Sequence, residues 1–544
     1  MKRLIYLFGL LFLVSSCNDF LDRYPNDDLS NKDVWKTEKD LKLSVNYLYT
    51  GLKPSISLDN QTIDAFGPKS SLNTVSSSTH VRPTSDGGNW DSKFDFLRVS
   101  NNFVENYESA NLADNVKEKY LGEALFFRAW YYHDLVRRYG DMVLVLRTLD
   151  LDSEELYAGR DPRAAVVDQI VNDLKDAVDF LPAKGTELYE EGRINKGIAE
   201  GFLARVALYE GTHQKYHGGD RDANELLDLA VTSAKNVIDR GNYRLFEDYV
   251  GLFLWENEKN SETMFAHHIR FPNRNGRPGQ AETAPTKHLA DIYLGVDGLP
   301  IDHENSTINH SYLPLAEGTE FKNRDPRMAM TIWMPGARLL IPQNEGLPDD
   351  SEELKTYSPS VNGTMGSGYG LRKYNDGRNA AKNEVDNILM RFAEMYLIFA
   401  EATFEKNGSI TDAELNYSVN VLRDRVGMPA KLNNAFVQEN NLEMLTEIRR
   451  ERQAELGMEN FRYDDIIRWK TAETELPQDV LGVKYDEELF GPRPENIQVN
   501  EDGFILLQSA ESRSGFDANK HYLFPLPLDQ LSLNPKLGKN PGWL

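Results

Sequence analysis

Residues 449–469 read RRERQAELGMENFRYDDIIRW, a densely charged stretch. Three glutamates recur at every fourth residue among five arginines: Glu451, Glu455 and Glu459. One interpretation is a catalytic or metal-binding stripe on a helix. The alternative is an ion-pair network that joins two helices, with pairs such as Asp464 and Arg468 at i, i+4 spacing. We favour the network, because the glutamates and arginines can neutralise each other.

Helical periodicity extends over much of the chain before and around this segment. It predicts helices from the cap Thr37 to about Tyr49, over 114–139, from Asp161-Pro162 to Phe180, over 198–210 and over 226–240. Further helices are predicted over 385–405, from the capping box at Thr411 to about 426, over 442–456 and after Met458. Ala199 and Ala230 lie 31 residues apart on successive helices. That spacing is near the tetratricopeptide period of about 34 residues.

Two stretches have a different composition. Pro and Gly cluster over 256–382, and a second loop-rich stretch covers about 53–90. The last sixty residues are also irregular, with a strand predicted at Phe504 to Leu507. The predicted fold class is therefore mainly α, with helix pairs and an irregular, loop-rich half that contains short strands. Loops on a rigid scaffold are where binding residues concentrate.

The composition excludes several classes of protein. The 544 residues carry 85 Asp and Glu against 61 Lys and Arg, a net charge of −24. Such a surface repels phosphate backbones and argues against a nucleic-acid partner. The single cysteine permits neither an intrachain disulfide nor a multi-cysteine metal site. No phosphate-binding loop and no HExxH zinc motif is present, and a glycosidase carboxylate pair among so many acids carries no specificity.

The N-terminus reads MKRLIYLFGLLFLVSSC. Lys2 and Arg3 precede a short apolar run and two small residues, which is the layout of a secretory signal peptide. The sole cysteine, Cys17, follows where it resembles the end of a bacterial lipobox, at which the thiol is lipidated and the chain is cut before it. The alternative, a buried apolar helix, leaves the position of this cysteine unexplained. We expect a signal peptide over 1–16 and a lipid anchor at Cys17.

The segment quoted first also carries a family resemblance. Its ER-x-x-EL-x-x-E-x-x-R pattern, followed by D-x-x-RW, resembles the C-terminal signature of the SusD/RagB family of outer-membrane nutrient-binding lipoproteins from Bacteroidetes-type bacteria. Other family motifs occur in order along the chain: CNDFLD at 17–22, RAWYY at 128–132, YGD at 139–141, DPR at 325–327, RFAE at 391–394 and NPGW at 540–543. Asn460 stands where the family usually has Gly, and we expect this to affect only that helix junction.

The resemblance implies an α-fold of four tetratricopeptide-like helix pairs plus a more irregular half, here 17–255 and 256–544. It implies a surface lipoprotein that captures oligosaccharide, or peptide in a minority branch, and passes it to a TonB-dependent SusC-like transporter in the outer membrane. It implies no catalysis and no cofactor. A surface glycoside hydrolase and a tetratricopeptide scaffold without a small ligand are the competing hypotheses.

Sugars call for exposed Trp or Tyr rings flanked by polar side chains. The resemblance directs attention to loops of the first hundred residues and of the central block, where the candidates are Asn73, His80, Arg82, Trp90, Trp333, Tyr369, Arg372 and Tyr374. Structural alternatives are a helical core for Trp90, the inner face of a strand for Trp333, a hairpin for Tyr374, and a solvated loop tip for His80 and Arg82. The negative charge makes a polyanionic glycan unexpected unless Arg82 and Arg372 gather locally.

Overall fold

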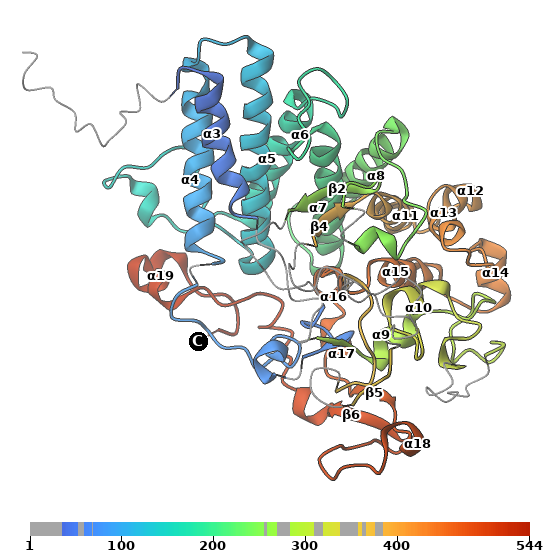
Figure 1. Cartoon of the computed structure of the whole chain (residues 1–544). Helices are drawn as coiled ribbons and strands as arrows, with labels where there is room; N and C mark the ends of the chain where they lie inside the picture. The colour runs from blue at the N-terminus through green and yellow to red at the C-terminus, as the bar shows by residue number, and fades with distance from the viewer. Residues whose placement is uncertain are drawn as a thin grey trace, which may run out of the picture.

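The structure is a computed structural model (Figure 1). It describes residues 35–52, 59–67, 69–86, 88–254, 258–268, 283–308, 319–337, 357–361, 366–375 and 385–543. The predicted signal peptide and Cys17 lie outside these residues. Within the described ranges, none of the helices combines the length and the apolar character needed to cross a bilayer.

Six helices of the first half pack in a row, each against the next along the chain from α4 onward (Figure 1). They are α3 (Glu38–Tyr49), α4 (Asp91–Asn106), α5 (Asp114–Tyr139), α6 (Arg163–Phe180), α7 (Lys196–His217) and α8 (Ala223–Arg240). The predicted cap at Thr37 is confirmed, and Asp40 adds the reciprocal bond that makes it a capping box. The predicted cap at Asp161 is wrong, because its carboxylate accepts the Leu144 amide instead, and α6 begins after Pro162.

Aromatic and small residues determine how these helices pack. Along α5, the rings of Tyr120, Phe127, Tyr131 and Tyr139 are all buried, as the periodicity predicts. Between α7 and α8, small side chains allow a close approach. A Cβ atom added at Gly211 would lie 3.0 Å from the Leu227 side chain, so no larger residue fits there without a shift. The aromatic residues of α5 are thus mainly core residues.

The second half begins with a short sheet rather than a helix. Strand β2 (Thr263–His267) pairs antiparallel with β4 (Asn387–Arg391), and α11 (Ala393–Asn407) follows directly. The helix predicted over 385–405 is therefore wrong in its first third, because pairing with β2 overrides the local periodicity. Helix α11 packs on both α8 and α15 (Met444–Leu456), which joins the two halves.

The remaining helices of this half are short. The capping box at Thr411 is confirmed, but its helix breaks at Ser418 into α12 (Asp412–Tyr417) and α13 (Val419–Arg425). The others are α9 (Lys287–Ile292), α10 (Pro326–Thr331), α14 (Asn434–Glu439), α16 (Arg462–Arg468), α17 (Ala472–Glu475), α18 (Glu487–Phe490) and α19 (Leu528–Leu533).

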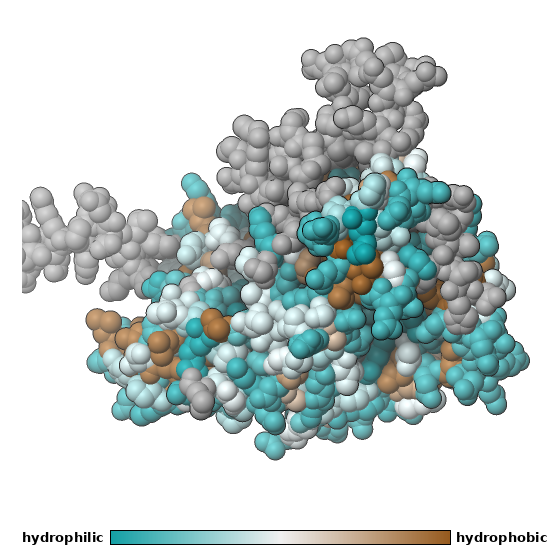
Figure 2. Space-filling model, turned by 90° about the horizontal axis from the view of Figure 1, so that it is seen from below, coloured by the Kyte–Doolittle hydropathy of each residue, from teal (hydrophilic) through white to brown (hydrophobic). Residues whose placement is uncertain are grey.

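Two further two-stranded sheets lie in the loop-rich regions. Strand β1 (Ala65–Phe66) pairs with β3 (Ala284–Pro285), and β5 (Val480–Lys484) pairs with β6 (Phe504–Gln508), which confirms the strand predicted near the C-terminus. Seen from below, the face of the molecule is mostly hydrophilic, with a few separate hydrophobic areas (Figure 2). Across the described residues the fold is mainly helical, and the named strands form these three small sheets.

The charged segment forms a buried ion-pair network, as predicted, but its partners lie elsewhere in the chain. The side chains of the three glutamates Glu451, Glu455 and Glu459 are almost completely buried. They pair with cations of four other segments: Arg327, Lys373, Arg391, Arg423 and Arg425. The predicted Asp464–Arg468 pair is wrong, since Arg468 binds Glu401 and Asp465. The charged segment therefore connects α15 to α10, β4 and α13, whereas the sequence predicted a network between two helices only.

Candidate ligand-binding cavity

The two loop-rich regions of the chain are tied together at β1 and β3. Thr286 donates its backbone amide to the Asp64 carbonyl at 3.0 Å and its hydroxyl to the Ile63 carbonyl at 2.5 Å. The carboxylate of Asp59 accepts the backbone amides of Met458 and Arg462 at 2.7 and 3.1 Å. The first loop is thereby held against both the central block and the charged segment.

The four aromatic candidates in these loops are buried, which contradicts the expectation of exposed rings. Trp90 is 5% exposed and packs against Tyr139 in the helical core. Tyr369 is 1% exposed and donates its hydroxyl to Glu320 at 2.6 Å. Trp333 and Tyr374 are also buried. Trp90 lies in the helical core, as its structural alternative predicts. Trp333 is buried as well, but it stacks against Tyr357 and does not lie in a strand.

The polar candidates Asn73, Arg82 and Arg372 each contact a different part of the chain. The buried side-chain amide of Asn73 accepts the backbone N–H of Gly67 and donates to the Gly67 carbonyl, and this pair of bonds closes a loop. Arg82 donates to the Trp543 carbonyl at 2.9 Å. Arg372 instead donates to the Ala329 carbonyl at 2.7 Å. Ligand binding by these residues stays a prediction.

His80 belongs to an aromatic cluster near the C-terminus. Its ring centroid lies 5.1 Å from that of Phe524 and 5.4 Å from those of His521 and Trp543. Burial and the neighbouring His521 lower the pKa of His80 to about 4, so the ring is neutral at pH 7. A neutral ring among aromatic residues serves packing or a neutral ligand rather than an anion.

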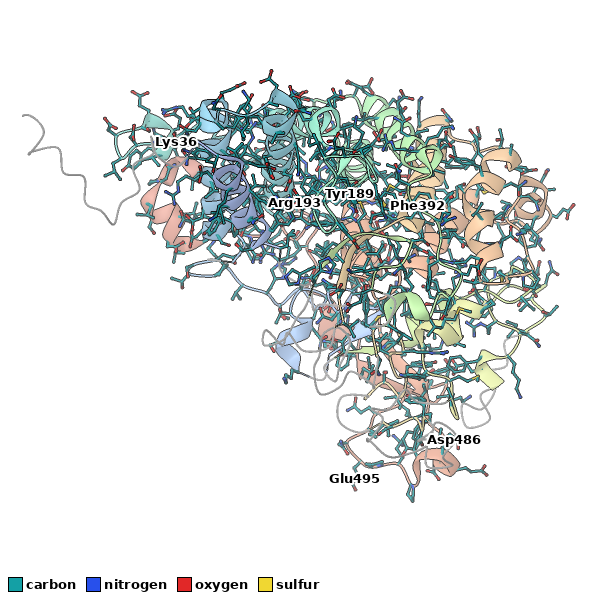
Figure 3. The ribbon with its side chains drawn as sticks, turned by 45° about the horizontal axis from the view of Figure 1, so that its top comes forward. Lys36, Tyr189, Arg193, Phe392, Asp486 and Glu495 are labelled. Carbon is teal, nitrogen blue, oxygen red and sulfur yellow. The ribbon has the colours of Figure 1, made fainter. Side chains whose placement is uncertain are left out.

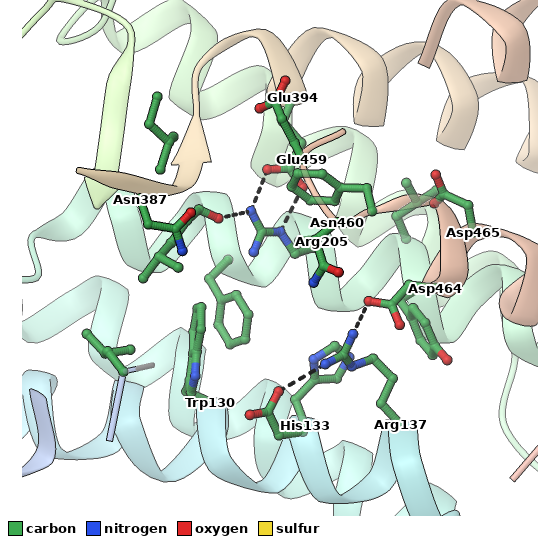
Figure 4. A pocket seen from close by; sticks show the side chains of 18 of the residues that line it. Trp130, His133, Arg137, Arg205, Asn387, Glu394, Glu459, Asn460, Asp464 and Asp465 are labelled. Carbon is green, nitrogen blue, oxygen red and sulfur yellow. Dashed lines mark hydrogen bonds and ion pairs between the residues drawn. The ribbon is translucent and has the colours of Figure 1, made fainter. Parts of the chain in front are cut away.

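A cavity of about 360 Å³ opens between α5, α7, β4 and the turn before α16 (Figure 4). A second cavity, of about 200 Å³, shares several of its lining residues, among them Asn89, Asp134 and Asn460, and reaches Phe524 beside His80. Trp130 of α5 lines the first cavity and is only partly buried. Its ring lies 4.6 Å from that of Phe202 on α7, so the cavity has an aromatic wall.

Charged side chains of the cavity are paired with each other. Asp134 accepts from Lys93 at 2.5 Å and from Arg137 at 3.1 Å, and Arg137 also binds Asp464. Burial alone raises the pKa of Asp134, but the charges of Lys93 and Arg137 outweigh burial and lower it to about 2. Arg205 in turn binds Glu394 through two bonds, of 2.7 and 2.6 Å. The walls thus present many donors and acceptors with little net charge.

Three amides and a neutral histidine complete the lining: Asn89, Asn387, Asn460 and His133. Burial lowers the pKa of His133 well below its usual value, so it is uncharged. An aromatic ring flanked by amides and fixed ion pairs matches what the C–H faces and hydroxyls of a sugar require.

Glycoside hydrolysis places its own requirements on carboxyl groups. That chemistry needs a carboxylic acid with a raised pKa facing a second carboxylate. Burial raises the pKa of Asp59 and of Glu320 to about 7. Neither residue lines this cavity or the one that adjoins it. Asp134, which does, is held ionised by its cations.

A family model described as "SusD family" matches residues 252–543, more than half of the chain. The chain belongs to the SusD family. A second model, described as "Starch-binding associating with outer membrane", matches residues 19–208. A SusD-like protein of Bacteroides ovatus is 25% identical over 520 residues, which cover 92% of this chain and 88% of that protein.

Solved structures of SusD-like proteins share the fold. A SusD-like protein of Bacteroides fragilis has a TM-score of 0.75 at 22% identity and covers 96% of this chain and 100% of its own. A laminarin binding SusD-like protein has a TM-score of 0.61 at 21% identity, covering 94% of this chain and 100% of its own. The resemblance carried by the 449–469 segment is thereby confirmed.

The residues that line the cavity were not among the predicted candidates, apart from Tyr374, which forms part of its wall. Trp130 precedes the core residue Tyr131 by one residue, which places its side chain about 100° further around the helix. This offset is the signal from which a position at the edge of the core could have been predicted. Asn387 falls in the segment wrongly predicted as helix. Asn460 was recognised only as a departure from the usual Gly.

Proposed function

We propose that this SusD-family chain is a cell-surface lipoprotein that captures oligosaccharide and passes it to a TonB-dependent transporter in the outer membrane. Family membership carries the carbohydrate-binding part of the proposal. The cavity beside Trp130 is the location that the geometry supports best. The model name that mentions association with the outer membrane supports the cellular location.

The cavity suits a short part of a neutral sugar chain. Its volume of about 360 Å³ is at the lower end of the range of about 300–1,000 Å³ that is typical of small-ligand sites. The Trp130 ring offers an apolar platform for the C–H face of a sugar, and the amides of Asn387 and Asn460 offer hydroxyl partners. Because its ion pairs are internally compensated, the cavity provides no excess charge for an anionic glycan.

Affinity electrophoresis of the mature chain in gels that contain single neutral polysaccharides, laminarin among them, tests this proposal. We expect one polysaccharide to retard migration, and Trp130→Ala to weaken that binding at least about tenfold, as for a central aromatic contact. Tyr157→Ala is the matched control, since this tyrosine is 57% exposed and lies outside the cavity.

Asn460→Gly provides a second variant that leaves the backbone undisturbed. Asn460 has a φ of 69°, a conformation that glycine adopts without cost, so this change removes the amide and keeps the backbone turn. We expect several-fold weaker retardation. Retardation of both variants equal to that of the parent would contradict the cavity as the site. Release of reducing ends by the pure protein would instead favour the hydrolase, and retention of peptides alone would favour the peptide-binding branch.

A further inference from the structure

The second cavity, of about 200 Å³, is continuous with the Trp130 cavity. Six residues line both spaces: Asn89, Lys93, Asp134, Arg137, Asn460 and Asp464. A further cavity, of about 530 Å³ beside Tyr189 and Arg193 (Figure 3), shares no lining residue with either of them. The first two cavities therefore form one longer space, which leads from Trp130 on α5 to Phe524 near the C-terminus.

Two polar side chains line the second cavity but not the first, and they have no hydrogen-bond partner in the part of the chain that the structure describes. They are the amide of Gln61 and the hydroxyl of Tyr463, and both residues are partly buried. Burial raises the pKa of Tyr463, so its hydroxyl remains a donor at neutral pH. Polar groups in such surroundings take a partner from water or from a ligand, and a ligand rich in hydroxyls can supply one to both.

The charges around the second cavity are compensated. Each of the three cations in its lining has a carboxylate partner: Lys93 with Asp134, Arg137 with Asp134 and Asp464, and Arg138 with Asp86. The guanidinium of Arg138 also lies 3.8 Å from the centroid of the Phe524 ring. The second cavity therefore favours neither an anion nor a cation, and its two free polar groups suit the hydroxyls of a neutral sugar.

One carboxylate holds these polar groups at fixed positions. Asp59 accepts two backbone amides at 2.7 and 3.1 Å, one on each side of Asn460. Gln61 follows Asp59 by two residues, and Tyr463 directly follows the second of these amides. The loop that carries Gln61 is therefore joined to the turn that carries Asn460 and Tyr463. Groups that are already in place before a ligand arrives reduce the entropy cost of binding.

We propose that the second cavity is a subsite for the next unit of the neutral sugar chain that lies beside Trp130; this rests on the function proposed above. The Gln61 amide and the Tyr463 hydroxyl bind hydroxyls of that unit, and Asn460, which lines both cavities, contacts the units on either side of it. The protein then selects an oligosaccharide over a single sugar, because only a longer ligand forms the hydrogen bonds of both cavities at once.

Isothermal titration calorimetry on the full mature chain measures this selectivity. The probes are fragments of one, two, three, four and six sugar units, prepared from the neutral polysaccharide that retards the parent chain. We expect the affinity to rise at least about tenfold between one and four units and to change little beyond, because two additional hydrogen bonds form. Gln61→Ala and Tyr463→Phe should each weaken binding of the four-unit fragment about three- to tenfold and leave binding of the single unit unchanged. Trp130→Ala should weaken both.

Gln438→Ala and Tyr157→Phe are the matched controls, since both residues are exposed and line neither cavity; neither change should alter the affinities. Equal affinity of the parent chain for one and four units would overturn the subsite. Variants at Gln61 and Tyr463 that have no effect, or that weaken binding of every length alike, would also overturn it. If Trp130→Ala still weakens binding in that case, the function proposed above stands without the second subsite. A parent chain that no neutral polysaccharide retards would overturn both.

Discussion

Replacing Glu455 by Gln tests whether the charged segment stabilises the fold or performs chemistry. The Glu455 side chain is completely buried. Its carboxylate accepts Arg391 Nη1 at 2.7 Å and Arg327 Nη1 at 3.2 Å, and it also binds Arg425. Burial alone raises its pKa, but the charges of Arg425, Arg391 and Arg327 outweigh burial and hold the pKa well below its usual range. Gln keeps the volume and removes the charge.

The expected loss of stability depends on which carboxylate partners remain for the three arginines after the change. Removing one partner of a buried ion pair costs about 3–5 kcal/mol, because the remaining charge is left uncompensated in a poorly solvated place. Glu262 still pairs with Arg391 and Arg425, and therefore we place Glu455→Gln at the lower end, about 3 kcal/mol. If Glu455 were a catalytic or metal-binding group, its removal would leave stability unchanged or raise it, as is common at active sites.

Urea unfolding followed by tryptophan fluorescence and circular dichroism measures this difference. Lys235→Gln is the control, because its pair with Asp239 is half exposed on one helix and should be worth below about 0.5 kcal/mol. Salt at 1 M should abolish the control's small effect and leave the Glu455→Gln penalty in place, since buried pairs are screened far less. A penalty below about 1 kcal/mol for Glu455→Gln, with an unchanged denaturant slope, would refute the reasoning.

Three further predictions concern other parts of the chain. Burial and the charge of Asp64 raise the pKa of Asp59 from 3.8 to about 7. Between about pH 4 and 7 the folded state therefore keeps a proton on Asp59 that the unfolded state has released. As the pH rises through this range, the free energy of unfolding should fall by roughly 1.4 kcal/mol per pH unit. Urea midpoints at pH 5 and 8 should differ less in Asp59→Asn, and an unaltered difference would count against this origin. An added Cβ at Gly482 would lie 2.3 Å from the Ser367 carbonyl oxygen; Gly482→Ala should therefore lower the unfolding free energy by about 1–3 kcal/mol, while Gly159→Ala, whose nearest atom is 3.5 Å away, should not. Cys17→Ala should move the protein from the membrane to the soluble fraction, and unchanged fractionation would defeat the lipid-anchor hypothesis.

Helices with local signals could be predicted from the sequence, and elements that depend on distant partners could not. The cap at Thr37, the capping box at Thr411 and the apolar stripe of α5 involve neighbouring residues only, so the sequence contains the complete information. Strand β4 exists because it pairs with β2, more than a hundred residues earlier. Its own sequence is compatible with a helix, and the prediction failed there for that reason.

The site was harder to predict than the fold for a related reason. Composition identifies aromatic residues in loops, but burial decides which rings a ligand can reach. Trp333 and Tyr369 lie in loop-rich sequence, yet both are buried: Tyr369 belongs to the small core beneath the loops, and Trp333 stacks against Tyr357. Trp130 lies on α5, where a core role was the natural interpretation, yet it is only partly buried and lines the cavity.

Asn460 connects the family signature to the cavity. The turn between α15 and α16 places both Met458 and Asn460 at positive φ, 65° and 69°, a region that Gly occupies freely and Asn tolerates better than most residues. This geometry explains why Gly is usual at the position and why Asn is an acceptable replacement. The expectation that the change affects only the helix junction is wrong, because Asn460 lines both the Trp130 cavity and its neighbour. The ion pairs of Glu455 and Glu459 fix the end of the preceding helix, so the family signature holds this backbone turn in place beside the cavity.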